Sequence, residues 1–183
     1  MSYQFIHIED YGRNAAKKTK NDGKNKKYND ETKGRSVSQI ISEAKRENGF
    51  CPHVEKPEDP ILLYGVGLEE VERLAIEYHE NTKIADKNGK VKKLRTDANI
   101  LLAGVISLNR ENIEIWDDYK NDSIAYLKNK YGKNLISVIE HTDEEHPHLH
   151  FYCIQDIGKR FDLLHDGKKA LFENKDKKNT IKI

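Results

Sequence analysis

The sequence has few of the residues that build a large apolar core or a covalent framework. Only 36% of its 183 residues are hydrophobic and 34% are charged, whereas typical globular proteins have about 45–50% and 25%. Two cysteines, Cys51 and Cys153, cannot form a disulfide framework, so we expect a protein of the reducing cytoplasm. No apolar run approaches the roughly 18 residues of a membrane helix, and the N-terminus lacks the pattern of a signal peptide. We therefore expect no membrane contact by this segment.

Charge is abundant but unevenly distributed, although the net charge is only +1. Residues 13–35 hold nine Lys or Arg and three acidic residues, and residues 159–183 hold eight and four. Two basic ends beside an acidic middle suit a polyanion such as nucleic acid. Lysines that only solvate surface loops would give the same counts, so charge alone leaves both interpretations open.

Apolar periodicity and turn residues predict an α+β fold. Strands are expected at residues 3–8, 61–64, 100–108, 135–141 and 148–154, and helices at 36–48, 69–81, 112–130 and 168–174. Because these elements follow no regular βαβ order, we expect an antiparallel sheet with helices packed on one face. The stretch 12–34 is rich in Lys, Asn, Asp and Gly with almost nothing apolar, which predicts a mobile basic loop.

Histidines gather near the end of the chain, where four of the eight are His141, His146, His148 and His150. His148 and His150 are two residues apart in a predicted strand, so their imidazoles project from the same face. His141 ends the preceding strand, and a short hairpin would bring it opposite that pair. Three converging imidazoles predict a metal site with open coordination positions, as a catalytic metal needs. The structural alternative is a histidine-rich hairpin that only ends the sheet.

The segment HTDEEHPHLH at residues 141–150 resembles the metal motif of the Mob/Pre relaxases, the MobV type of plasmid mobilisation and recombination proteins. These belong to the HUH endonucleases, which are named for a histidine–hydrophobe–histidine sequence, here His148-Leu149-His150. Weaker matches extend over most of the chain: the opening MSYQFIHIEDY, the strand at 97–107, the helix with Trp116, and the turn at Asp166-Gly167.

The resemblance implies an HUH-type fold and a relaxase that nicks one strand of single-stranded or hairpin DNA at a plasmid or mobile-element origin. It implies a divalent metal on His141, His148 and His150, foremost Mn²⁺ with Zn²⁺ or Mg²⁺ as alternatives, and Glu144 as the residue that positions or deprotonates the nucleophile. The enzyme would remain joined to the 5′ end of the cut strand. Family members generally continue into helical regions, so we expect residues 1–183 to be one relaxase domain of a longer, self-associating protein.

The attacking residue is where the chain departs from the best-known Mob/Pre relaxases, which carry a nucleophilic histidine in an HNxR motif on the first helix. If Arg46 is aligned with the arginine of that motif, Glu43 stands in the place of the histidine. A carboxylate can attack phosphorus. The other candidates are Tyr28 in the basic stretch and His53 after the helix. Each also has a structural interpretation, as an ion-pair partner, a surface residue or a turn residue.

Three further functions compete with the relaxase. A rolling-circle replication initiator or transposase of the HUH class would share the chemistry, and a non-cleaving DNA-binding module that keeps the metal site would explain the absent HNxR histidine. A small metallohydrolase unrelated to DNA would leave the basic ends without a role. In the DNA-binding interpretations, the residues expected to contact the DNA backbone are Lys17, Lys18, Lys26, Lys27 and Arg46.

Overall fold

The architecture is that of a computed structural model that describes residues 4–22, 25–33, 35–86 and 88–180. Its centre is a five-stranded antiparallel sheet in the order β1-β7-β9-β8-β4. The strands are β1 (Gln4–Gly12), β4 (Ile61–Gly65), β7 (Asn99–Leu108), β8 (Leu135–His141) and β9 (His148–Cys153). All five coincide with predicted strands, and the long apolar β7 lies inside the sheet between β1 and β9.

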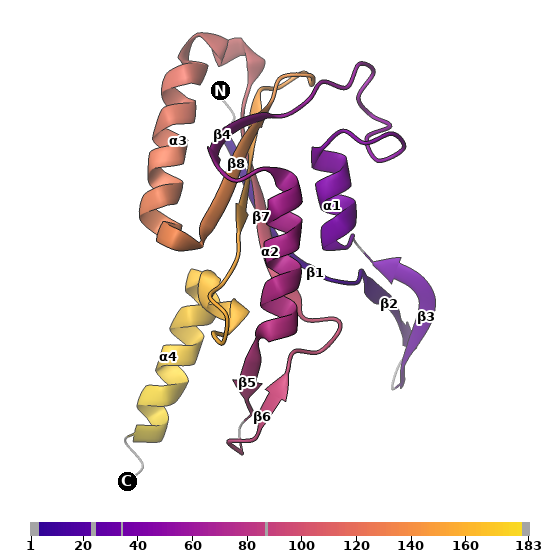
Figure 1. The fold of residues 1–183 in the computed structure, drawn as a ribbon, viewed down its shortest axis with the longest axis vertical. Coiled ribbons are helices and arrows are strands. Elements are labelled where there is room, and N and C mark those ends of the chain that lie inside the picture. Colours follow the sequence, from indigo (N-terminus) through magenta and orange to yellow (C-terminus); the bar gives the residue numbers. More distant parts are fainter. Residues whose placement is uncertain (1–3, 23–24, 34, 87, 181–183) are drawn as a thin grey trace.

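Helices cover both faces of this sheet rather than the single face that the sequence predicts. In Figure 1, α3 (Trp116–Tyr131) lies on one side of the sheet and α1 (Val37–Ala44) on the other, with α2 (Leu68–Asn81) beside α1. Two neighbours in β8 define the faces: Glu140 accepts a hydrogen bond from Trp116 of α3, whereas the His141 ring meets Ala44 of α1. Strands that are apolar on both faces need cover on both sides, and β7 and β8 have such sequences.

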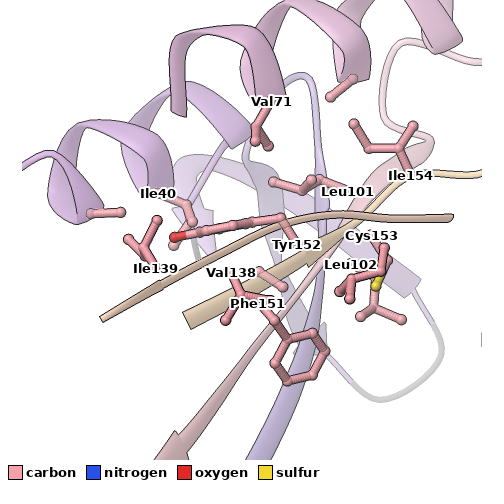
Figure 2. Close-up of a cluster of buried hydrophobic side chains, with 14 of the residues drawn as sticks. Ile40, Val71, Leu101, Leu102, Val138, Ile139, Phe151, Tyr152, Cys153 and Ile154 are labelled. Atoms are coloured by element: carbon pink, nitrogen blue, oxygen red, sulfur yellow. The ribbon is translucent and has the colours of Figure 1, made fainter. Parts of the chain in front are cut away.

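The hydrophobic core follows from this double cover. Figure 2 shows Ile40 of α1 and Val71 of α2 near Tyr152 on one side of the sheet, with Val138 and Phe151 on the other. All five side chains are at most 9% exposed. The apolar content, low overall, is therefore concentrated in the sheet and in the helix faces packed on it.

The first helix begins where the sequence predicts and ends earlier. Ser36 caps its N-terminus through a reciprocal pair of hydrogen bonds with Gln39. The helix stops at Ala44, because Arg46 adopts a left-handed conformation with φ of 59°; the predicted end lies at about Asn48. This turn directs the Arg46 side chain back toward the sheet, where it meets two carboxylates.

The stretch 12–34, predicted as a mobile basic loop, contains a hairpin of two strands that the sequence did not predict. Strands β2 (Ala16–Asp22) and β3 (Asn25–Lys33) pair antiparallel beside the main sheet. Backbone pairing of two strands does not require apolar side chains. A second small hairpin, β5 (Lys83–Ala85) and β6 (Val91–Lys93), surrounds the predicted turn at 86–90.

The remaining elements agree with the predicted helices but shift their bounds. A 3₁₀ helix, η1 (Arg110–Ile115), precedes α3, and η2 (Gly132–Asn134) and η3 (Phe161–Leu164) are short 3₁₀ turns. The last helix, α4 (Asp166–Thr180), is longer than the predicted 168–174. Within the described ranges, no helix is long and apolar enough to cross a membrane.

Candidate metal centre

Three histidines converge at one end of the sheet, as the sequence predicts. His141 of β8 pairs with His148 of β9, and His150 follows two residues later on the same face. The ring centroids lie 4.8–5.3 Å apart. One nitrogen from each ring can be chosen such that all three lie within 4.8 Å of one another. This spacing fits three imidazoles around one ion.

Backbone carbonyls hold two of these rings in orientation. The Nε2 atom of His141 lies 2.9 Å from the carbonyl oxygen of Ala44, and Nδ1 of His148 lies 2.9 Å from that of His146. A carbonyl can only accept, so each of these nitrogens carries the proton. The lone pairs then belong to Nδ1 of His141 and Nε2 of His148. The former is buried and has no hydrogen-bond partner in the described part of the chain, as a metal ligand would require.

Burial lowers the pKa of two of the three imidazoles. Desolvation, followed by the charge of Arg46, lowers the pKa of His141 to about 4. Desolvation and the neighbouring histidines also hold the pKa of His150 well below its ordinary value. Neutral rings at physiological pH present lone pairs to a cation without first losing a proton. The donor set therefore fits a divalent metal.

An ion-pair network lies directly beside the histidines. Arg46 donates two hydrogen bonds to Asp143, at 2.8 and 2.6 Å, and a third to Glu144 at 2.7 Å. Burial would raise the pKa of Glu144, but His148 and Arg46 together hold it below its ordinary value, so the carboxylate is ionised at neutral pH. The side chain of Arg46 is only 4% exposed because it is engaged with these two carboxylates, and the predicted contact of Arg46 with DNA stays a prediction.

A cavity of about 430 Å³ opens over the cluster. It brings together two of the three candidate nucleophiles, Glu43 and His53, with His148, His150 and Glu144. The Nε2 atom of His53 lies 3.5 Å from Oε1 of Glu144, and the carboxylate of Glu43 is paired with Arg35.

The third candidate nucleophile and four predicted DNA contacts lie on the basic hairpin. Tyr28 is on β3, and the lysines are on β2 and β3. Their side chains lie outside the described part of the structure, so the roles of Tyr28, Lys17, Lys18, Lys26 and Lys27 remain predictions.

Comparison with known proteins decides the family. The Mob_Pre family, described as plasmid recombination enzymes, matches residues 69–182, which is more than half of the chain and includes the histidine motif. The chain belongs to the Mob/Pre family. No curated protein sequence matches it significantly.

Two solved structures of a Mob/Pre relaxase are similar to this Mob/Pre chain. The Mn-bound MobM relaxase domain in complex with origin DNA of plasmid pMV158 aligns with a TM-score of 0.54 and 14% identity, over 92% of this chain and 79% of that one. MobM bound to a 26-nucleotide origin DNA aligns with a TM-score of 0.48 and 14% identity, over 95% and 82%. The first alignment confirms the predicted α+β fold of the HUH type.

Sequence reasoning missed three features of this Mob/Pre site: the partner of Glu43, the role of Arg46, and the aromatic side chain of Phe5 in the cavity wall. The ion pairs depend on tertiary contacts and left no signal in the sequence. The position of Phe5 could have been predicted, because the alternation of side chains along β1 places Phe5 and His7 on the same face of the strand.

Proposed function

We propose that this Mob/Pre protein nicks one strand of DNA at an origin of transfer, using a divalent metal held by His141, His148 and His150. The observation that carries the proposal is the convergence of three imidazoles at an open cavity, in a chain of the plasmid recombination family. The similar MobM domain is Mn-bound and in complex with origin DNA. From this likeness we infer that the substrate is single-stranded or hairpin DNA of an origin of transfer.

Manganese is the metal we propose first, because the similar MobM domain is Mn-bound. Three imidazole ligands disfavour Mg²⁺, which prefers oxygen, and leave Zn²⁺ as the alternative. When bound, the ion would act as a Lewis acid that neutralises charge on the phosphate oxygens. The cavity lined by His148 and His150 would let a phosphodiester approach an ion held by the histidines.

Among the candidate nucleophiles we favour His53. It is half exposed and its Nε2 faces the Glu144 carboxylate at 3.5 Å, an arrangement of nucleophile and orienting acid that recurs in covalent catalysis. The carboxylate of Glu43 is tied to Arg35, which reduces its electron-pair donation. Glu43 therefore serves better as a group that holds Arg35 at the site.

The step that follows transfers the phosphoryl group from the 3′ oxygen to a nitrogen of His53. Nδ1 of His53 forms a bond to phosphorus, the bond from phosphorus to the 3′ oxygen breaks, and the 5′ phosphate remains on the imidazole. The departing 3′ oxygen takes up a proton, and His53 loses one from Nε2. The Glu144 carboxylate, held in place by Arg46, lies where it can carry this proton.

We expect the reaction to take place in the cytoplasm, where its plasmid substrate lies. Plasmid DNA lies in the cytoplasm, and both cysteines are free and buried, which suits a reducing compartment. The basic hairpin β2–β3 would bind the DNA backbone. Self-association through a region beyond these residues is a further expectation.

The proposal is tested with supercoiled plasmid carrying the DNA that flanks the protein's own gene, incubated with Mn²⁺. We expect nicked circles and a covalent protein–DNA adduct from the wild type, and neither from His148→Ala. If neither product forms while the protein still binds the metal, the nicking function is wrong. That result would favour the non-cleaving DNA-binding module, the alternative suggested by Glu43 at the position of the HNxR histidine.

The chemical stability of the adduct identifies the attacking residue. A phosphoramidate on His53 survives base and breaks in acid, an acyl phosphate on Glu43 breaks in base, and a phosphate ester on Tyr28 survives both. We expect an acid-labile, base-stable adduct that is lost in His53→Ala and retained in Tyr28→Phe. A base-labile adduct that disappears in Glu43→Gln would overturn the assignment to His53.

A further inference from the structure

Two aromatic rings lie side by side on the edge strand next to the metal centre. Phe5 pairs with Ser107, which in turn pairs with His148, so these three residues form one row across β1, β7 and β9. His7 forms the next row through Val105 and His150. The rings of both rows project from the same face, and Phe5 lies two strand spacings, or about 10 Å, from His148.

The geometry of the pair is that of a flat surface. The ring centroids of Phe5 and His7 are 6.0 Å apart and their planes differ by only 12°. Phe5 is 54% exposed, so its ring contributes little to the packed core. Exposure of a large aromatic side chain at the edge of a functional cavity is typical of a binding surface.

The pair also belongs to the cavity system of the metal centre. Phe5 lines the cavity of about 430 Å³ over the histidines. His7 lines an adjoining cavity of about 190 Å³. Both cavities are lined by Glu43, Val105 and His150, so a ligand seated at the histidines extends directly onto the two rings.

The charges around the rings select a neutral, planar ligand. Glu43 and Glu144 in the cavity walls are each paired with an arginine, whereas the carboxylate of Glu9 lies 3.3 Å from His7. A phosphate on the rings would meet the charge of Glu9, whereas a nucleobase carries no charge and presents a π-face to aromatic side chains. The phosphate of the same strand is better placed at the metal.

We propose that Phe5 and His7 form a stacking platform for an unpaired base of the DNA strand whose phosphate lies at the histidine cluster. This inference rests on the proposed function and deepens it. The platform positions the strand so that one phosphodiester lies over His148 and His150. Because every base has a π-face, stacking raises affinity without reading sequence, and Phe5 is a positioning residue rather than a catalytic one.

The test measures the binding of a fluorescent single-stranded oligothymidylate to the full chain with Mn²⁺. Loss of a stacking side chain costs about 1–3 kcal/mol per base, so Phe5→Leu should weaken binding by about 5- to 150-fold, whereas Phe5→Trp retains a ring and keeps the affinity. The matched control is Ile6→Ala, because Ile6 is 56% exposed on the opposite face of the same strand. Thermal unfolding of each variant verifies that the fold is intact.

Photocrosslinking places the base directly. An oligothymidylate with one 5-iodouracil, irradiated in the complex, should crosslink to a β1 peptide of the wild type and of Ile6→Ala, with the bond on Phe5 or His7. The crosslink should fall sharply in Phe5→Leu. Wild-type binding with no crosslink to β1, equal affinities of Phe5→Leu and Ile6→Ala, or an absence of binding would each overturn the platform.

Parallel nicking assays separate this inference from the proposed function. If the wild type nicks plasmid but Phe5→Leu leaves affinity and crosslinking unchanged, the platform is wrong and the nicking function stands. If the β1 crosslink forms and depends on Phe5 while no nicking occurs, the platform stands as a DNA-binding surface and the nicking function is wrong.

Discussion

Arg46 connects the histidine cluster to the helix that precedes it. Its left-handed backbone ends α1 and turns the guanidinium onto Asp143 and Glu144, while the carbonyl of Ala44, two residues earlier, orients His141. One turn of chain thus fixes both a metal-ligand candidate and the acidic residue beside it. The site is rigid because of these contacts rather than because of the hairpin alone.

Removal of Arg46 should therefore destabilise the protein as well as the site. Arg46→Met leaves the side chain of Asp143, which is 1% exposed, without its cation, and breaking a buried ion pair typically costs about 3–5 kcal/mol. Urea unfolding measures the loss. Arg73→Met is the matched control, because Arg73 also meets two carboxylates but is 58% exposed, and such pairs contribute about 0.2–1 kcal/mol. Equal losses in the two variants would contradict this account.

The buried histidines make the metal-free protein sensitive to acid. The pKa of His141 is about 4 in the folded state against about 6.5 in an unfolded chain. Between these values the unfolded chain binds a proton that the folded protein does not, so stability is complete above about pH 6.5 and falls as the pH decreases toward 4.

The expected slope is about 1.4 kcal/mol per pH unit for each such histidine. Urea unfolding at a series of pH values, with a chelator present, measures it. His141→Gln should flatten the dependence, whereas the same substitution at the exposed His146 leaves it in place. A wild-type stability that does not change between pH 6.5 and 4.5 would show that the imidazole is solvated.

At the residue scale, the sequence predicts what depends on strand alternation. The i, i+2 spacing of His148 and His150 and the register of the hairpin suffice to bring the three imidazoles together. The roles of Arg46 and Glu43 could not be predicted, because they depend on a left-handed turn and on an arginine eight residues away from its partner. Neither feature has a local sequence pattern.

At the scale of elements, the strands and helices that carry apolar periodicity are predictable and the basic hairpin is not. Strands β7, β8 and β9 bury alternate or continuous apolar residues, so their sequence pattern is strong. Strands β2 and β3 are joined by backbone hydrogen bonds in a segment with almost no apolar residues, and composition alone then predicts a loop.

The basic hairpin should dominate the salt dependence of DNA binding. Each lysine that contacts a phosphate of a single strand contributes about −0.7 to the slope of log K against log salt. Replacing Lys17, Lys18, Lys26 and Lys27 by Gln should therefore make the slope shallower by up to about 3, as measured by fluorescence anisotropy with an oligonucleotide.

The matched control removes the same number of charges from the other small hairpin. Lys83, Lys90, Lys92 and Lys93 lie on or beside β5 and β6 and are exposed. Their replacement by Gln should leave the slope close to that of the wild type. Equal changes in the two variants would mean that net charge, and not the β2–β3 hairpin, governs the binding.

At the scale of the whole molecule, the two faces of the sheet differ: α3 covers one face, and the other face carries the histidines and the cavities. Trp116 and Lys120 of α3 engage the buried Glu140 on one side, and this contact closes that side of β8. On the other side, α1 covers only part of the sheet, so the histidines, Glu144 and the rings of β1 open into connected cavities. Two-sided cover was not predicted, because periodicity assigns a buried face to each helix but not the side of the sheet that it packs on.

The central claim is that the three histidines hold a catalytic divalent metal, and calorimetric titration with Mn²⁺ tests it most directly. Loss of a residue that only hydrogen-bonds to a metal ligand typically lowers metal affinity about 10–100-fold, and His150→Ala should weaken Mn²⁺ binding by more than this. His146 lies in the nearby turn but outside the cluster, so His146→Ala should bind Mn²⁺ as the wild type does. Nicking of supercoiled plasmid should be lost in the first variant and retained in the second. Equal Mn²⁺ affinities in all three proteins would contradict the account.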